Sequence, residues 1–203
     1  MKLSVENLAQ HLPRYLSAER LDGIKKGLAD FPNIAFWYVN AYDSEVLQGD
    51  CWAGLTALHF DDGTRKKIRG VVISNSCSID PGNTPRTPQQ IVFVPLLKVE
   101  TLKALFERHG HAEATITSEL AAIRRQEVDS FVYYPASARL GEESVAWLDQ
   151  VHTMPVKTFL ADDSRAKLGT LGDTSFYLFA FKLSIYFCRL HENVDRSEAV
   201  HQA

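Results

Sequence analysis

Several short strand-like segments lie close together in this chain, and their spacing restricts its fold more than any other feature. Cys51 to Phe60, "CWAGLTALHF", is rich in strand-forming residues, and the turn Asp61-Asp62-Gly63 leads into a second such stretch, Arg65 to Ser74. The two segments predict a hairpin. A third strand is expected from Gln90 to Leu97, where Pro95 predicts an edge or strand-end position because proline cannot donate to a sheet ladder.

Helices and further strands are predicted in the rest of the chain. Residues 99–108 and 112–126 have helical apolar spacing, and Phe131–Tyr134 and Ser144–Val151 are typical of strands. Residues 168–193 predict a long closing helix. The regular strand–helix–strand alternation of a Rossmann-like sheet is absent, so the pattern predicts an α+β fold built on a small, mostly antiparallel barrel.

The first 48 residues predict a helical N-terminal extension. Between residues 5 and 30 leucines and an isoleucine recur at helical intervals, and Pro13 and Ser17 divide the stretch into two helices. Phe31 to Val39 predicts a short strand or an extended linker. The expected organisation is therefore an extension over residues 1–48 and a barrel over 49–203, with a helical insertion near 99–126.

Composition excludes some classes of function and favours others. Of the 203 residues 45% are hydrophobic and 23% are charged, with a net charge of -3, so no overall positive field attracts nucleic acid, although a local basic patch is compatible with these numbers. Three cysteines without a CxxC pair do not predict a disulfide framework, and a cytoplasmic location is expected. No secretory signal, membrane span, metal or cofactor is predicted.

The stretch "RGVVISNSCSID", Arg69 to Asp80, places hydroxyls and a thiol directly after an apolar run. Ser74 and Cys77 are therefore candidate substrate-binding residues. A catalytic cysteine needs a nearby base, and only His59, across the predicted hairpin, is a candidate; an inert thiol is the simpler interpretation. Asp80 is expected to cap its own turn.

Charged clusters supply the remaining candidates. Arg65, Lys66 and Lys67, together with Arg69, form the densest basic stretch, which predicts either an RNA phosphate surface or an ordinary solvated hairpin. His109-Gly110-His111 is interpreted as a helix–helix turn because a zinc site needs further ligands. The pairs Glu142-Glu143 and Asp162-Asp163 are interpreted as surface acids.

Three pieces of the sequence, in order, resemble the MazF/PemK (Kid) toxins. Gly49-Asp50 precedes the first strand, Arg69 to Asn75, "RGVVISN", leads to Ile91–Leu96, "IVFVPL", and Ser144–Thr153, "SVAWLDQVHT", precedes the closing helix. The family has a Gly-Asp, an Arg-Pro before a "VVLSN"-type strand, a "V-x-P-I-T" strand and an "SV-x-x-L-[DE]-Q-[IV]-x-T" segment in SH3-like barrels. The resemblance therefore implies a divergent SH3-like barrel.

The family cleaves single-stranded RNA without a metal, by attack of the 2′-hydroxyl on the adjacent phosphate. The resemblance implies that Arg69 stabilises the phosphate, as the family's arginine does. This sequence departs from the family pattern at two positions. Gly70 replaces the proline, and Leu97 occupies the position of the family's hydroxyl residue, where leucine cannot donate or accept a proton. Lys98 follows directly and is a candidate for contacting substrate.

Two main hypotheses follow from the resemblance. The first is an RNA-cleaving toxin of a toxin–antitoxin or phage-defence system, favoured by Arg69 and its basic neighbours. The second is a non-catalytic barrel that binds RNA or a protein partner, favoured by Leu97. An antitoxin-like partner and a homodimer are implied by the family, and an unrelated SH3-like adaptor is a third interpretation.

Overall fold

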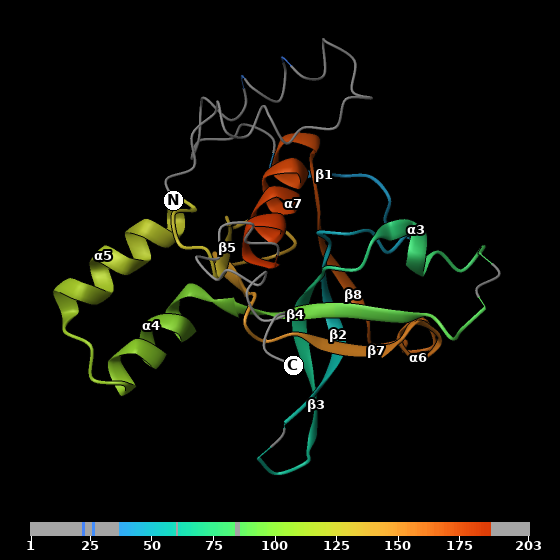
Figure 1. Ribbon diagram of the computed structural model, residues 1–203, viewed down its shortest axis with the longest axis horizontal. Coiled ribbons are helices and arrows are strands. Elements are labelled where there is room, and N and C mark those ends of the chain that lie inside the picture. Colours follow the sequence, from blue (N-terminus) through green and yellow to red (C-terminus); the bar gives the residue numbers. More distant parts are fainter. Residues whose placement is uncertain (1–21, 23–25, 27–36, 60, 84–85, 188–203) are drawn as a thin grey trace, which may run out of the picture.

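The computed structural model describes residues 22, 26, 37–59, 61–83 and 86–187 of the chain (Figure 1). Most of the predicted N-terminal helical extension and the last ten residues lie outside this part. The described residues form one eight-stranded antiparallel sheet and five helices, which confirms the α+β class. The strands are β1 (Tyr38–Val39), β2 (Cys51–Leu58), β3 (Arg65–Val72), β4 (Gln90–Lys98), β5 (Phe131–Tyr134), β6 (Ser144–Trp147), β7 (His152–Pro155) and β8 (Ala166–Leu171).

The sheet curls into a half-barrel. Its strand order is β1-β8-β2-β3-β4-β6-β5, and β7 pairs with the first half of β4. The two ends of this order approach each other, because the Tyr38 hydroxyl in β1 donates to the carbonyl of Pro135, just after β5, at 2.7 Å. The antiparallel pairing and the curl agree with the predicted small barrel.

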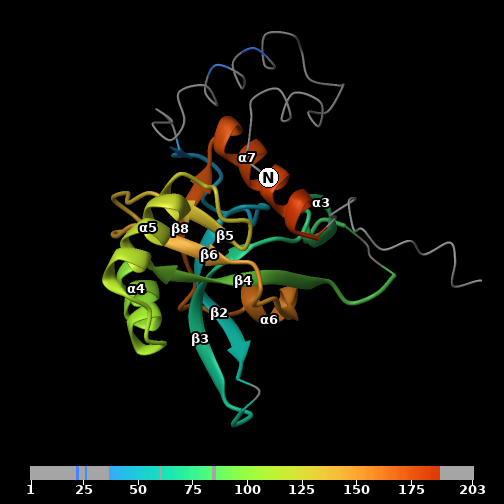
Figure 2. The same cartoon turned by 60° about the vertical axis from the view of Figure 1, so that its left-hand side comes forward.

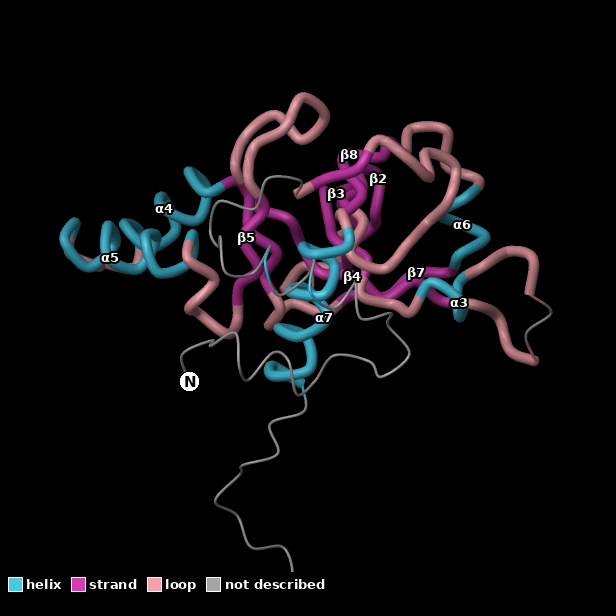
Figure 3. The backbone as a smooth tube through the Cα atoms, turned by 90° about the horizontal axis from the view of Figure 1, so that it is seen from above, coloured by secondary structure: helices cyan, strands magenta, loops and turns pink. Residues whose placement is uncertain are grey.

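The predicted hairpin of β2 and β3 is confirmed, and it protrudes from the body of the sheet (Figures 1 and 2). The predicted helical insertion is confirmed as α4 (Val99–Arg108) and α5 (Glu113–Arg124), joined by a turn in which Gly110 has a φ of 79°. Each helix carries a glutamate in its first turn and an arginine in its last, which complements the helix dipole. Figure 3 shows both helices on the side of the sheet opposite α3 (Ser76–Ile79) and α6 (Val156–Leu160).

Three sequence predictions about this region of the fold are wrong. The predicted helix over 168–193 is strand β8 up to Leu171, and helix α7 covers only Asp173–Phe187 within the described residues. The predicted strand Ser144–Val151 ends at Trp147, a turn follows, and β7 begins at His152. Pro95 lies inside the sheet: β4 pairs with β7 up to Phe93 and with β6 from Leu96, so the missing N–H falls where β4 changes partners.

Hydrophobic side chains form three clusters around the sheet. The first lies between the sheet and α7, where Cys51, Val71 and Phe179 meet. The second contains Trp52 and Phe159 from α6, and the third joins α4 and α5 to β5 and β6. Within the described residues, no helix has the length and apolar composition needed to cross a membrane.

Candidate functional site

Arg69 lies in β3 on the face that carries the first hydrophobic cluster. Its partner across the hairpin is Ala53, two pairs away from the fully buried Cys51 opposite Val71, so the two pairs share one face of the sheet. The guanidinium Nη2 donates to the carbonyl of Leu140 at 3.0 Å, and Nε is buried without a hydrogen bond among the described residues. The fold therefore closes the Nε/Nη2 edge of Arg69, the edge that would hold a phosphate in two parallel hydrogen bonds.

The groups around Arg69 are poor proton carriers. Burial raises the pKa of the Tyr38 phenol and of the Cys51 thiol, while the nearby charge of Arg69 lowers both by a smaller amount. Both groups therefore stay protonated at neutral pH. Neither is suited to accept a proton from a 2′-hydroxyl.

Leu97 packs away from Arg69. It pairs with Val145 in β6 and contacts the third hydrophobic cluster, beneath the helical insertion. Lys98, the last residue of β4, forms an ion pair with Glu142 at 2.8 Å, and both side chains are exposed. The predicted substrate contact at Lys98 thus has an intramolecular partner.

Ser74 and Cys77 have structural surroundings. Ser74 is buried, and its hydroxyl oxygen accepts a hydrogen bond from the Val92 N–H at 2.7 Å. Cys77 is exposed in the short helix α3, where its own N–H donates to the side chain of Asn75, the N-cap. None of the described hydrogen bonds or ion pairs joins Ser74, Cys77 or Lys98 to Arg69.

The basic stretch Arg65 to Lys67 lies on the protruding β2–β3 hairpin. Arg65 and Lys66 are exposed and form no ion pair with the described residues. Lys67 reaches the loop before β8, where its ammonium contacts Asp162 at 2.7 Å and the Ser164 hydroxyl at 2.6 Å. The hydrogen bond from Lys67, together with those that the Ser164 hydroxyl and N–H donate to Asp162, lowers the pKa of Asp162 to about 2.

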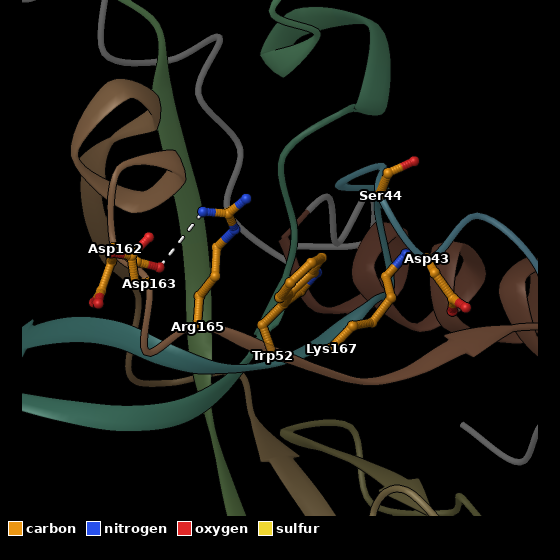
Figure 4. A pocket seen from close by; sticks show the side chains of 7 residues that line it. All are labelled: Asp43, Ser44, Trp52, Asp162, Asp163, Arg165 and Lys167. Atoms are coloured by element: carbon orange, nitrogen blue, oxygen red, sulfur yellow. Dashed lines mark hydrogen bonds between the residues drawn. The ribbon is translucent and has the colours of Figure 1, made fainter.

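That same loop forms one wall of a cavity of about 360 Å³ (Figure 4). We call it the Arg165 pocket. The opposite wall is the segment before β2, and the floor is formed by side chains of β2 and β8. Its lining residues are Asp43, Ser44, Trp52, Asp162, Asp163, Arg165 and Lys167.

Arg165 is fixed in this pocket by one of its nitrogens. Nη1 donates to the carbonyl of Leu160 and, at 3.4 Å, to that of Asp162. Nε and Nη2 make no hydrogen bond to the described residues, and neither is a buried atom. In Figure 4 these two nitrogens face the side of Trp52 and Ser44, away from the anchored one.

A buried ion pair supports the floor of the Arg165 pocket. Lys167 and Asp50 are joined at 2.8 Å, with side chains that are 4% and 1% exposed. Lys167 also donates to the Tyr42 carbonyl at 2.5 Å and lies 5.3 Å from the centre of the Trp52 ring. Burial raises the pKa of Asp50, and Lys167 partly opposes this by lowering it.

A glycine bulge brings the two sides of this floor together. Gly54 has a φ of 91° at the register shift between β2 and β3, and a Cβ there would lie 2.9 Å from the Arg165 Cα. Only glycine therefore allows β2 to approach the backbone of Arg165 this closely. Trp52, two residues before Gly54, lines the same pocket as Arg165.

Sequence reasoning missed the Arg165 pocket entirely. Asp163 is exposed, as the sequence predicts, whereas the Asp162 side chain is 19% exposed and bonded to Lys67. The available signal was the alternation of Arg165 and Lys167 opposite Trp52, but it depends on the pairing of β8 with β2. The histidine pair is a turn, as expected, and His111 packs against Phe106.

Comparison with known proteins adds no relative to this picture. No protein-family model matches the chain, and no curated protein matches its sequence. The resemblance to the MazF/PemK toxins therefore rests on the quoted residues, and the SH3-like identity of the barrel stays a prediction.

Proposed function

We propose that this chain is a divergent MazF/PemK-like barrel that binds single-stranded RNA without cleaving it. The observation that carries the proposal is the position of the basic stretch. Arg65 and Lys66 project from a protruding hairpin, and Lys67 links that hairpin to the wall of the Arg165 pocket. A cationic surface that leads to a polar pocket is suited to follow a nucleic-acid backbone.

Arg69 is the reason for proposing binding without cleavage. Cleavage through the 2′-hydroxyl needs a base and an acid beside a cation. Here the cation is held by the Leu140 carbonyl, and its titratable neighbours are a phenol and a thiol with raised pKa values. Leu97 packs under the helical insertion and supplies no hydroxyl.

A role in a toxin–antitoxin or phage-defence system, with an antitoxin-like partner, remains a proposal that the family resemblance alone supports. The same holds for a homodimer. In such a system a barrel that binds RNA without cutting it would act by occupying or sequestering the strand.

The test measures binding and cleavage in one reaction. Purified protein is mixed with a labelled single-stranded RNA of mixed sequence in chelator, affinity is measured by fluorescence anisotropy, and the RNA is recovered for sizing. We expect binding with intact RNA. Replacing Arg65 and Lys66 by glutamine should make the dependence of log affinity on log salt shallower by about 1.4, because each phosphate contact to a single strand contributes about 0.7.

Arg108→Gln is the matched control, since this exposed arginine lies on the helical insertion and not on the hairpin. It should leave the affinity unchanged. Shortened RNA that is absent from a reaction with Arg69→Gln would establish the endonuclease instead. Failure of the wild-type protein to bind any single-stranded RNA would contradict the proposal altogether.

A further inference from the structure

We propose that the Arg165 pocket holds one phosphodiester of the bound RNA, with Arg165 as its principal contact. This inference rests on the proposed function and assigns it a site. The pocket lies outside the set of residues to which the family resemblance points. Four features of the structure support it: the open edge of Arg165, the charge balance, the unsatisfied donors and the position beside the hairpin.

The open edge of Arg165 has the geometry that a phosphate needs. Nε–H and Nη2–H are parallel donors on one side of the planar guanidinium, and two non-bridging phosphate oxygens match their spacing. Because Nη1 is anchored to the Leu160 and Asp162 carbonyls, the fork is held in place before a ligand arrives.

Ion pairing leaves one cation and one carboxylate of the Arg165 pocket without a partner among the described residues. Three of its charged lining residues already have partners: Asp162 pairs with Lys67, Asp43 with Arg139, and Lys167 with Asp50. Arg165 forms no ion pair with the described residues. Exposed Asp163 at the rim repels a free dianionic phosphate more strongly than a phosphodiester, which carries one charge.

Two further donors lack acceptors. Trp52 is 4% exposed, and its indole Nε1–H has no hydrogen-bond partner among the described residues. A buried donor without an acceptor is unfavourable, and a ligand oxygen that reached this nitrogen would satisfy it. The exposed Ser44 hydroxyl on the opposite wall also makes no hydrogen bond to the described residues and completes a set of donors suited to an oxygen-rich group.

The position and the volume of the Arg165 pocket both suit an RNA strand that runs along the hairpin. Lys67 Nζ lies 2.6 Å from the Ser164 hydroxyl, so the basic hairpin reaches the pocket wall directly. A cavity of about 360 Å³ exceeds the volume of a phosphate group and leaves room for the adjoining ribose. A strand that runs along the hairpin can therefore enter the pocket without a break in its contacts.

The experiment compares Arg165→Gln with the wild-type protein on uridine, adenosine and cytidine homopolymers and on a guanine-containing strand. We expect about tenfold weaker binding to all four RNAs, since a charge-assisted hydrogen bond contributes at least that factor. The salt dependence should become shallower by about 0.7. Arg165→Lys keeps the charge without the fork and should recover only part of the affinity.

A second measurement needs no substitution. In uniformly 15N-labelled wild-type protein, the Arg165 Nε–H signal should shift on addition of the uridine homopolymer, while that of Arg69 should stay in place. This readout remains informative even if Arg165→Gln disturbs the loop that Arg165 anchors.

Each other outcome overturns the inference in a recognisable way. If the wild type binds RNA and Arg165→Gln binds equally well, the pocket does not hold the strand, although the proposed function stands. A loss confined to the guanine-containing strand would assign the pocket to a base edge. Failure of the wild type to bind RNA would overturn both proposals, and Arg165-dependent binding of an acidic peptide would then indicate a protein carboxylate as the ligand.

Discussion

Arg69 lies within strand β3 and Arg165 lies directly before strand β8 of the same sheet, and the two guanidinium groups have opposite surroundings. In Arg69 the Nε atom is buried and Nη2 is held by Leu140, so the edge that could grip a phosphate is used by the fold. In Arg165 the protein holds Nη1 and leaves that edge open to a cavity. The difference teaches that a sequence match to a catalytic arginine does not by itself indicate a phosphate site. The Nε/Nη2 edge of the guanidinium must also be free.

The largest expected effect concerns the ion pair that supports the open arginine. Lys167→Met should lower the free energy of unfolding by about 3–5 kcal/mol, because Asp50 would remain buried without its cation. Urea unfolding measures this loss. The double variant Asp50→Asn/Lys167→Met should recover part of it, and a loss below about 1 kcal/mol in the single variant would show that the pair is unimportant.

The bulge at which β2 approaches the backbone of Arg165 gives the next effect. Gly54→Ala should cost about 2–3 kcal/mol, since alanine is strained at a φ of 91° and its Cβ would meet the backbone of Arg165. Gly82→Ala is the control, because a Cβ there meets only the Asp80 side chain. Equal unfolding midpoints for the two variants would contradict the close approach.

A pH-dependent effect of similar size concerns α7, which covers the hydrophobic cluster beside Arg69. Lys182 is 2% exposed and donates to the carbonyls of Gln126 and Val128, and burial lowers its pKa to about 7. The unfolded chain keeps this proton up to about pH 10.5, so the cost of burying the charge is largest below pH 7 and declines as the pH rises.

We therefore expect this group to add about 2 kcal/mol of stability between pH 7 and pH 9. Urea unfolding at both pH values measures the change. The control is Lys182→Met, which removes this contribution and leaves those of the other titrating groups. Between pH 7 and pH 9 the free energy of unfolding should therefore rise by about 2 kcal/mol more in the wild type than in this variant. Parallel pH profiles would mean that Lys182 keeps its ordinary pKa in the folded protein.

The smallest expected effect concerns the surroundings of Arg69, the arginine whose edge is used by the fold. Leu97→Thr introduces the type of residue that the MazF/PemK toxins carry at the position that Leu97 resembles, yet its hydroxyl would enter the cluster under α4. We expect a loss of about 1 kcal/mol in stability and no RNA cleavage. Cleavage by this variant would show that the site around Arg69 lacked only a hydroxyl.

Local patterns predicted much of the fold. The hairpin of β2 and β3 and the helices α4 and α5 were predictable because their apolar periodicity and turn residues are contained in short windows. Strand β8, "AKLGTL", was mistaken for helix because its extended form depends on pairing with β1 and β2, which are distant in sequence. Arg165 was missed for the same reason: in "DDSRAK" it resembles any charged loop residue.

The most direct test of the central claim compares two single substitutions on one labelled single-stranded RNA. Arg69→Gln and Arg165→Gln are assayed side by side for affinity, and the RNA is recovered from each reaction for sizing. We predict that Arg69→Gln binds as tightly as the wild type, that Arg165→Gln binds about tenfold more weakly, and that the RNA stays intact throughout. Weaker binding by Arg69→Gln with wild-type affinity in Arg165→Gln would contradict the account.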